Sequence, residues 1–226
     1  MLSLPWLPTP AVESGPGCEV LQDGLLQEPI AAVTSLAFVV AAVVVLLLER
    51  GTGNRAGPSR RGSRGSLLIY VALVAGVGIG SLIQHGPDPV WSDPAHDVPL
   101  LATVAFVGAD AAAALTGRRR AWWWWALPTV ALMPLVVALP RPGDVAQVAV
   151  AVVAVVLTLA RAWTFPAVRR RIGWAVALLA AGGVLGALSR ADGPLCDPTS
   201  LWQGHAVWHI LAAVALVVLA PVVTRR

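Results

Sequence analysis

Seven apolar runs separated by short polar segments account for most of this chain. Each run is close to the roughly 20 residues that a helix needs to cross a bilayer. The predicted helices cover residues 29–48, 66–85, 98–116, 122–139, 145–163, 172–189 and 203–222. We therefore predict an all-α integral membrane protein with seven transmembrane helices.

The composition agrees with a membrane protein and excludes a nucleic-acid-binding one. Hydrophobic residues make up 57% of the chain and charged residues only 12%, about half the charged share of a soluble domain. All sixteen basic residues are arginine, and they occur in short clusters between the apolar runs, as in membrane-protein loops. The arginine-only, alanine- and valine-rich composition indicates a GC-rich bacterial genome, so we expect a multi-pass protein of the bacterial plasma membrane.

The arginines are concentrated on one side of the predicted membrane. Fourteen of the sixteen lie on the side that includes the C-terminus, whereas Arg141 and Arg190 lie on the other. By the positive-inside rule, the N-terminus is outside and the C-terminus cytoplasmic. Residues 1–28 then form an extracytoplasmic segment, 29–222 the membrane domain and 223–226 a cytoplasmic tail. The start of the chain lacks a basic region and an apolar region, so we expect no cleavable signal peptide.

Six polar side chains are predicted at the outer ends of the second, third and seventh helices. They are Ser81, His85, His96, Asp97, His205 and His209. The pairs Ser81–His85 and His205–His209 are each four residues apart and so lie on one helix face. Three imidazoles with one open position are the arrangement of a catalytic zinc, which gives hydroxide at neutral pH. Asp97 and Ser81 are the candidates for a proton acceptor and for a hydroxyl at the reacting oxygen.

At these residues the sequence resembles the alkaline ceramidase family, which belongs to a superfamily of seven-span hydrolases that includes the adiponectin and progestin receptors. The resemblance rests on CE at 18–19, EP-x5-S at 28–35, GIGSLIQH at 78–85, HD at 96–97 and SLWQGHAVWH at 200–209. It implies zinc bound by His85, His205 and His209, with Ser81 and Asp97 at the metal-bound water. The implied reaction is hydrolysis of a lipid amide, such as ceramide or another N-acyl lipid, to a fatty acid and an amine.

The two cysteines are predicted on the same outer side. Cys18 lies in the N-terminal segment and Cys196 in the loop before the last helix, where an oxidising environment favours a disulfide. The resembled family has a corresponding bridge, which here would support the loop that leads to His205.

A calcium site is a further implication of the resemblance. Glu19 and Glu28 match acidic residues of the family's site, and Asp23 lies between them. Pro16-Gly17 and Ala31 depart from the family pattern, and the segment offers few of the six to eight oxygens that calcium needs. Calcium is therefore a weaker expectation than zinc.

Other interpretations stay open from the sequence. The same histidines could close a structural zinc site in a receptor-like or structural membrane protein without turnover, or ligate haem iron. His96 is an alternate ligand, because the spacing from His85 to Asp97 is one residue longer than the family pattern. For Asp110, inside the third predicted helix, we expect a structural partner such as Arg161 rather than catalysis. The natural lipid, oligomeric state and regulation are not predicted.

Overall fold

The computed structural model describes residues 13–52 and 60–224, which form seven α-helices. Their bounds are α1 Pro29–Thr52, α2 Arg60–His85, α3 Ser92–Thr116, α4 Trp123–Ala138, α5 Pro140–Thr164, α6 Pro166–Leu188 and α7 Gly204–Thr224. The first twelve residues of the predicted outer segment, the stretch 53–59 and the last two residues of the predicted tail lie outside the described residues.

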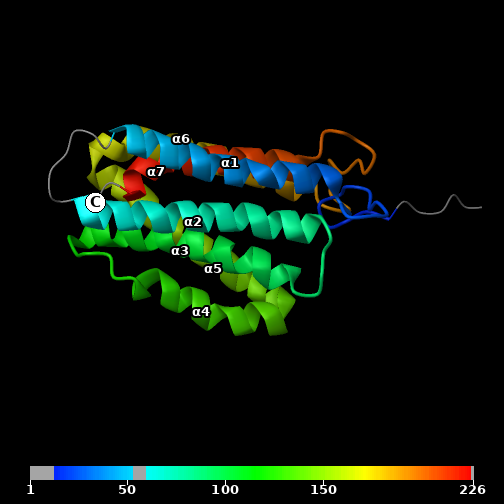
Figure 1. Cartoon of the computed structure of the whole chain (residues 1–226), viewed down its shortest axis with the longest axis horizontal. Coiled ribbons are helices and arrows are strands. Elements are labelled where there is room, and N and C mark those ends of the chain that lie inside the picture. The colour runs from blue at the N-terminus through cyan, green and yellow to red at the C-terminus, as the bar shows by residue number, and fades with distance from the viewer. Residues whose placement is uncertain (1–12, 53–59, 225–226) are drawn as a thin grey trace, which may run out of the picture.

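Each of the seven predicted apolar runs is a helix in the structure, and successive helices run in opposite directions along the bundle (Figure 1). Six are long and apolar enough to cross a membrane, whereas α4 has only 16 residues. The chain is thus a multi-pass helical membrane protein, and the seven-span count stays a prediction. Helices α3, α5 and α6 begin five or six residues earlier than predicted. The prediction followed hydropathy, and a polar first turn of a helix has low hydropathy.

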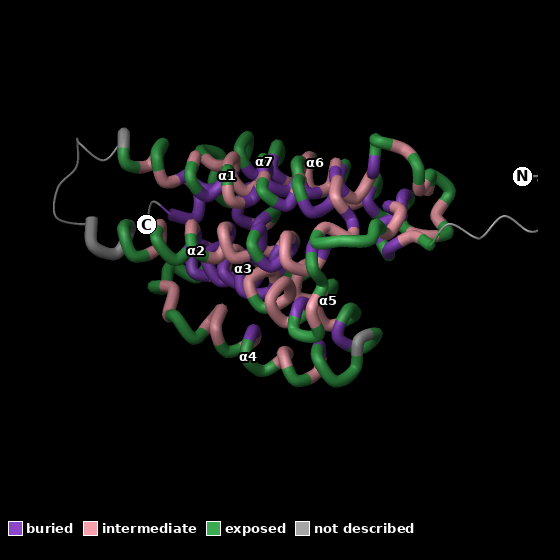
Figure 2. The backbone as a smooth tube through the Cα atoms, turned by 45° about the vertical axis from the view of Figure 1, so that its right-hand side comes forward, coloured by how far each residue is buried: buried purple, intermediate pink, exposed green. Residues whose placement is uncertain are grey.

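The buried centre of the bundle is formed mainly by α1, α2, α3 and α7 (Figure 2). Tyr70 and Phe106 are fully buried there, and the Tyr70 hydroxyl donates to the Leu216 carbonyl across 2.7 Å. Helix α4 lies at the edge and contacts α3 and α5. Three of these four helices, α2, α3 and α7, carry the histidines, so the predicted site stands on the buried centre of the fold.

Glycines allow two pairs of helices, α2 with α3 and α6 with α7, to approach closely. A methyl group at Gly80 of α2 would overlap the Ala95 carbonyl oxygen of α3. One at Gly182 of α6 would lie 2.8 Å from the Trp208 ring of α7, closer than van der Waals contact permits. These contacts set the depth and rotation of the helix turns that carry Ser81 and His209.

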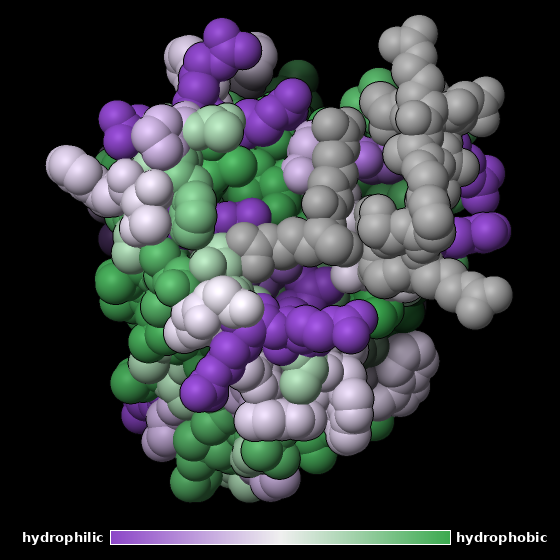
Figure 3. All heavy atoms as spheres, turned by 90° about the vertical axis from the view of Figure 1, so that its left-hand side faces the viewer, coloured by the Kyte–Doolittle hydropathy of each residue, from purple (hydrophilic) through white to green (hydrophobic). Residues whose placement is uncertain are grey.

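The two ends of the bundle differ in their charged residues. The end shown in Figure 3 has a hydrophilic surface among apolar helix flanks, and the described arginines gather at this end, apart from Arg141 and Arg190. Near it, Asp110 accepts hydrogen bonds from Arg161 (2.6 Å) and Arg120 (2.9 Å). The predicted structural role of Asp110 with Arg161 is confirmed, and the second arginine is new. Which end faces the cytoplasm stays a prediction.

Candidate metal centre

Three of the four histidines meet at the end of the bundle opposite the arginines. His85 is the last residue of α2, and His205 and His209 lie in the first two turns of α7. One nitrogen from each ring lies within 4.8 Å of the other two. Among the described residues this is the one group of three or more side chains arranged to hold a metal ion. The sequence prediction that these histidines converge is confirmed.

The nitrogens that face one another are of the Nε2 type. His85 Nε2 and His205 Nε2 are 3.2 Å apart. A tetrahedral ion with metal–nitrogen bonds of about 2.0–2.1 Å holds its nitrogens roughly 3.3 Å apart. The pair is therefore spaced as two ligands of one small metal ion, and the donor set fits zinc.

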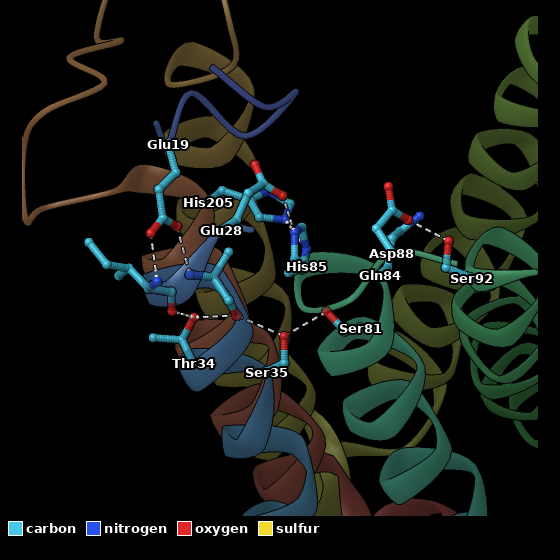
Figure 4. Close-up of polar contacts among 12 residues, drawn as sticks. Glu19, Glu28, Thr34, Ser35, Ser81, Gln84, His85, Asp88, Ser92 and His205 are labelled. Carbon is cyan, nitrogen blue, oxygen red and sulfur yellow. Dashed lines mark hydrogen bonds and ion pairs between the residues drawn. The ribbon is translucent and has the colours of Figure 1, made fainter. Parts of the chain in front are cut away.

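In two of these rings the other nitrogen, Nδ1, contacts a side-chain oxygen, from Glu28 just before α1 or from Thr34 within it. Glu28 Oε2 lies 2.5 Å from His85 Nδ1 (Figure 4), and Thr34 Oγ1 lies 3.1 Å from His209 Nδ1. The Thr34 hydroxyl has one proton, which it donates to the Ile30 carbonyl at 2.8 Å, so its oxygen accepts from His209 Nδ1–H. Both contacts place the ring proton on Nδ1 and leave Nε2 free to bind a metal. Metal-binding histidines usually have such partners.

Ser81 is buried beside the histidines, one turn before His85 on α2. Its hydroxyl oxygen lies 3.4 Å from His209 Nε2 and 2.8 Å from the Ser35 hydroxyl of α1. The predicted i, i+4 arrangement of Ser81 and His85 thus brings a hydroxyl to the metal-facing side of the cluster. A group in that position could donate a hydrogen bond to an oxygen held at the metal.

Asp97 and His96 lie in the second turn of α3 rather than at its first residue, because α3 begins at Ser92. Asp97 Oδ1 accepts a hydrogen bond from His96 Nδ1 at 2.9 Å. Among the described residues, no hydrogen bond joins Asp97 to His85, His205 or His209. His96 lies outside the three-histidine group but within electrostatic range of His205 and His209. The structure thus places the pair near the cluster, without direct contact.

The acidic residues considered for calcium have different surroundings. Both carboxylate oxygens of Glu19 accept hydrogen bonds from backbone amides of the first turn of α1, at Ile30 (2.6 Å) and Ala31 (2.9 Å), so Glu19 acts as a helix N-terminal cap. Glu28 contacts His85, and its second oxygen, Oε1, is buried without a hydrogen-bond partner. Asp23 is exposed. The calcium site stays a prediction.

A segment of the N-terminal region, Ser14–Val20, lies against His205 and Glu28 and is held by a disulfide. Cys18 and Cys196 are bonded, as predicted, and the Ala191 amide donates to the Pro16 carbonyl at 3.2 Å. A side-chain carbon at Gly17 would lie 3.3 Å from the His205 side chain, and one at Gly15 would overlap Glu28 Oε1. We call Ser14–Val20 the covering segment. Its glycines allow its backbone to lie directly on the site.

Sequence reasoning missed Thr34 and the contact of Glu28 with His85. The signal for Thr34 was present, since Thr34 and Ser35 are adjacent polar residues early in an otherwise apolar helix. Glu28 was assigned to calcium through the resemblance, and the residues alone did not indicate that it would reach an imidazole 57 positions away. The sequence matches no model of a known protein family and no curated protein.

Proposed function

We propose that this protein is a zinc-dependent membrane hydrolase that cleaves the amide bond of a lipid. The observation that carries the proposal is the convergence of His85, His205 and His209, with the Ser81 hydroxyl 3.4 Å from His209 Nε2. A structural zinc site has four protein ligands, whereas a catalytic site has three and an open position. Within the described residues the group has three members, which favours the catalytic alternative over a structural or receptor-like role.

The histidines would hold the ion, and Glu28, just before α1, and Thr34 of α1 would orient two of them. Zinc bound there would polarise a carbonyl and lower the pKa of a water molecule to about 7. Glu28 and Thr34 keep the Nε2 atoms of His85 and His209 directed at the ion. Because Glu28 directly precedes α1 and Thr34 lies in its second turn, the positions of two ligands are tied to the start of α1 and not only to their own helices.

In this proposal, Ser81 and Asp97 carry the remaining chemistry. The Ser81 hydroxyl donates a hydrogen bond to the amide oxygen as negative charge develops on it. Asp97 accepts a proton from the attacking water and returns it to the amide nitrogen as the C–N bond breaks. The products are a fatty acid and an amine. The hydrogen bond from His96 would hold the Asp97 carboxylate in a fixed orientation for the first step.

The lipid substrate is supported by the location of the site and by the resemblance to alkaline ceramidases. The site lies at one end of helices that are apolar along their length, so an N-acyl chain could remain in the bilayer while its amide reaches the histidines. The predicted orientation places this end outside a bacterial plasma membrane. Ceramide and other N-acyl amino lipids are both candidates.

The first experiment is elemental analysis of detergent-purified protein, with His209→Ala and His96→Ala in parallel. We expect about one zinc per wild-type chain and per His96→Ala chain, and none in His209→Ala. Zinc-loaded wild type is then tested with a panel of fluorescent N-acyl lipids beside Ser81→Ala and Asp97→Asn. The hydrolase proposal is supported if wild type cleaves a lipid amide and Ser81→Ala and Asp97→Asn lose this activity while still binding zinc. Full zinc content without turnover of any lipid amide contradicts it in favour of a structural or receptor-like protein.

A further inference from the structure

Residues of α5 and α6 line a groove near the junction of these two helices. The junction lies at the arginine-rich end of the molecule, away from the histidine-bearing end (Figure 1). Its volume is about 260 Å³. It is lined by Leu159, Ala162, Trp163, Arg169 and Gly173. Arg169 is the one charged residue of the five, so the groove combines a largely apolar wall with a single cationic group.

The cationic group is fixed in position by the end of α5. Arg169 donates from Nε to the Ala162 carbonyl at 3.2 Å and from Nη2 to the Trp163 carbonyl at 3.3 Å. Carbonyls in the last turn of a helix have no partner within that helix, so the arginine satisfies them. A guanidinium has five N–H donors, and these two bonds leave others to hydrogen bond with an anion.

The surroundings of the groove are positively charged. Arg170 and Arg171 follow Arg169 and are exposed, and α6 begins nearby at Pro166, where the partial positive charge of a helix N-terminus adds to theirs. The described acidic residues toward this end are Glu49 and Asp110, and Asp110 is paired with two arginines. The space-filling view of this end shows the resulting hydrophilic surface beside apolar helix flanks (Figure 3).

The apolar part of the groove has room for a chain. A side-chain carbon built at Gly173 would meet no other heavy atom within 4 Å. Trp163 is 80% exposed beside it. Tryptophan favours the level of lipid headgroups, so its position marks where the apolar wall meets the membrane surface.

We propose that this groove binds an anionic phospholipid, with its phosphate at Arg169 and an acyl chain along Leu159, Ala162 and Gly173. Charge complementarity selects the anionic class, because an arginine at the membrane surface attracts acidic lipids and hydrogen bonds well with phosphate. The site is independent of the metal centre and of the reaction proposed for it.

Native mass spectrometry of the full chain in neutral detergent tests this proposal. Phosphatidylglycerol and phosphatidylcholine of equal chain length are added separately, and the dissociation constant of the first bound lipid is measured. We expect phosphatidylglycerol to bind more tightly. Arg169→Gln should weaken phosphatidylglycerol binding roughly fivefold, which corresponds to about 1 kcal/mol for one arginine at the surface.

Two matched controls separate a site from diffuse attraction. Arg118→Gln removes an exposed arginine from another loop at the same end. Gly65→Leu adds the same side chain as Gly173→Leu at another glycine with open space around it. We expect Gly173→Leu, which fills the groove without changing charge, to weaken binding, and Gly65→Leu and Arg118→Gln to leave it unchanged. Equal affinity for both lipids, or equal losses in Arg169→Gln and Arg118→Gln, would overturn the proposal.

Discussion

Glu28 Oε2 lies 2.5 Å from His85 Nδ1, so the residue that precedes α1 holds the imidazole that ends α2. Both side chains are buried. The contact joins two helix ends at the point where the metal ligands meet, and it makes Glu28 part of the site although it lies outside the three-histidine group.

Replacing Glu28 by glutamine should weaken zinc binding by about 10–100-fold, the usual effect of losing a carboxylate that orients a ligand. The amide leaves the shape of the residue nearly unchanged but lacks the negative charge that favours a proton on His85 Nδ1. The zinc dissociation constant is measured by chelator competition. Glu13→Gln is the control, since Glu13 is an exposed acid of the same segment. An unchanged constant in Glu28→Gln would show that the contact does not orient the ligand.

Thr34→Val removes the hydroxyl that contacts His209 Nδ1 at 3.1 Å and keeps the branched shape of the side chain. We expect zinc affinity to fall by about tenfold, near the lower limit for such partners, because a neutral hydroxyl orients the ring less strongly than a carboxylate. Thr116→Val is matched, since Thr116 also hydrogen bonds to the carbonyl four residues before it, but at an exposed position. Equal zinc affinities of the two variants would show that Thr34 does not orient His209 for metal binding.

Gly182→Ala should destabilise the protein and weaken metal binding together. The added methyl group would lie 2.8 Å from the Trp208 ring, so α7 has to shift or rotate, and Trp208 immediately precedes His209. Overpacking of this kind costs about 1–3 kcal/mol. At Gly183 the same methyl group would lie 3.7 Å from Trp208, an ordinary contact. Melting temperature and zinc affinity are measured for both variants, and a loss in Gly183→Ala equal to that in Gly182→Ala would contradict this explanation.

Asp110→Ala should lower stability without affecting zinc content. Asp110 is 1% exposed and pairs with Arg161 and Arg120. Its removal takes the carboxylate from the buried Arg161, at a cost of about 3–5 kcal/mol. Asp144→Ala, at an exposed position, should change little. Thermal unfolding in detergent and elemental analysis of the surviving protein provide the two readouts. Loss of zinc from a well-folded Asp110→Ala protein would mean that the two ends of the bundle are coupled.

Hydropathy and residue spacing were sufficient to predict the helices and the convergence of His85, His205 and His209. The lengths of the apolar runs predicted the helices. Because successive helices alternate in direction, the C-terminal end of α2 and the N-terminal end of α7 were predicted on the same side. The pairing of Cys18 with Cys196 and of Asp110 with Arg161 followed from the same reasoning. Each of these predictions requires only that one knows at which end of the bundle a residue lies.

The features that could not be predicted depend on how each helix is rotated about its axis and on contacts between particular atoms. Nothing in a hydropathy profile indicates that Thr34 faces His209, or that Arg120 turns back to reach Asp110. Helix starts were placed too late where prolines or polar residues form the first turn, as at Ser92 and Pro166. Asp97 was predicted at the metal-bound water from its place at the outer end of the third helix and from the resemblance, and neither gives its rotation about α3 relative to the histidines.

The order of the ligands along the chain has a consequence for biosynthesis. His85 is in place once α2 has been made, but His205, His209 and Cys196 belong to the last part of the sequence. The ribosome therefore synthesises α1 to α6 before two of the three ligands exist, and Cys18 of the covering segment has no cysteine partner until Cys196 has been made. A three-histidine metal site therefore cannot form before α7 has been made, and a chain without α7 would retain a single histidine of the three.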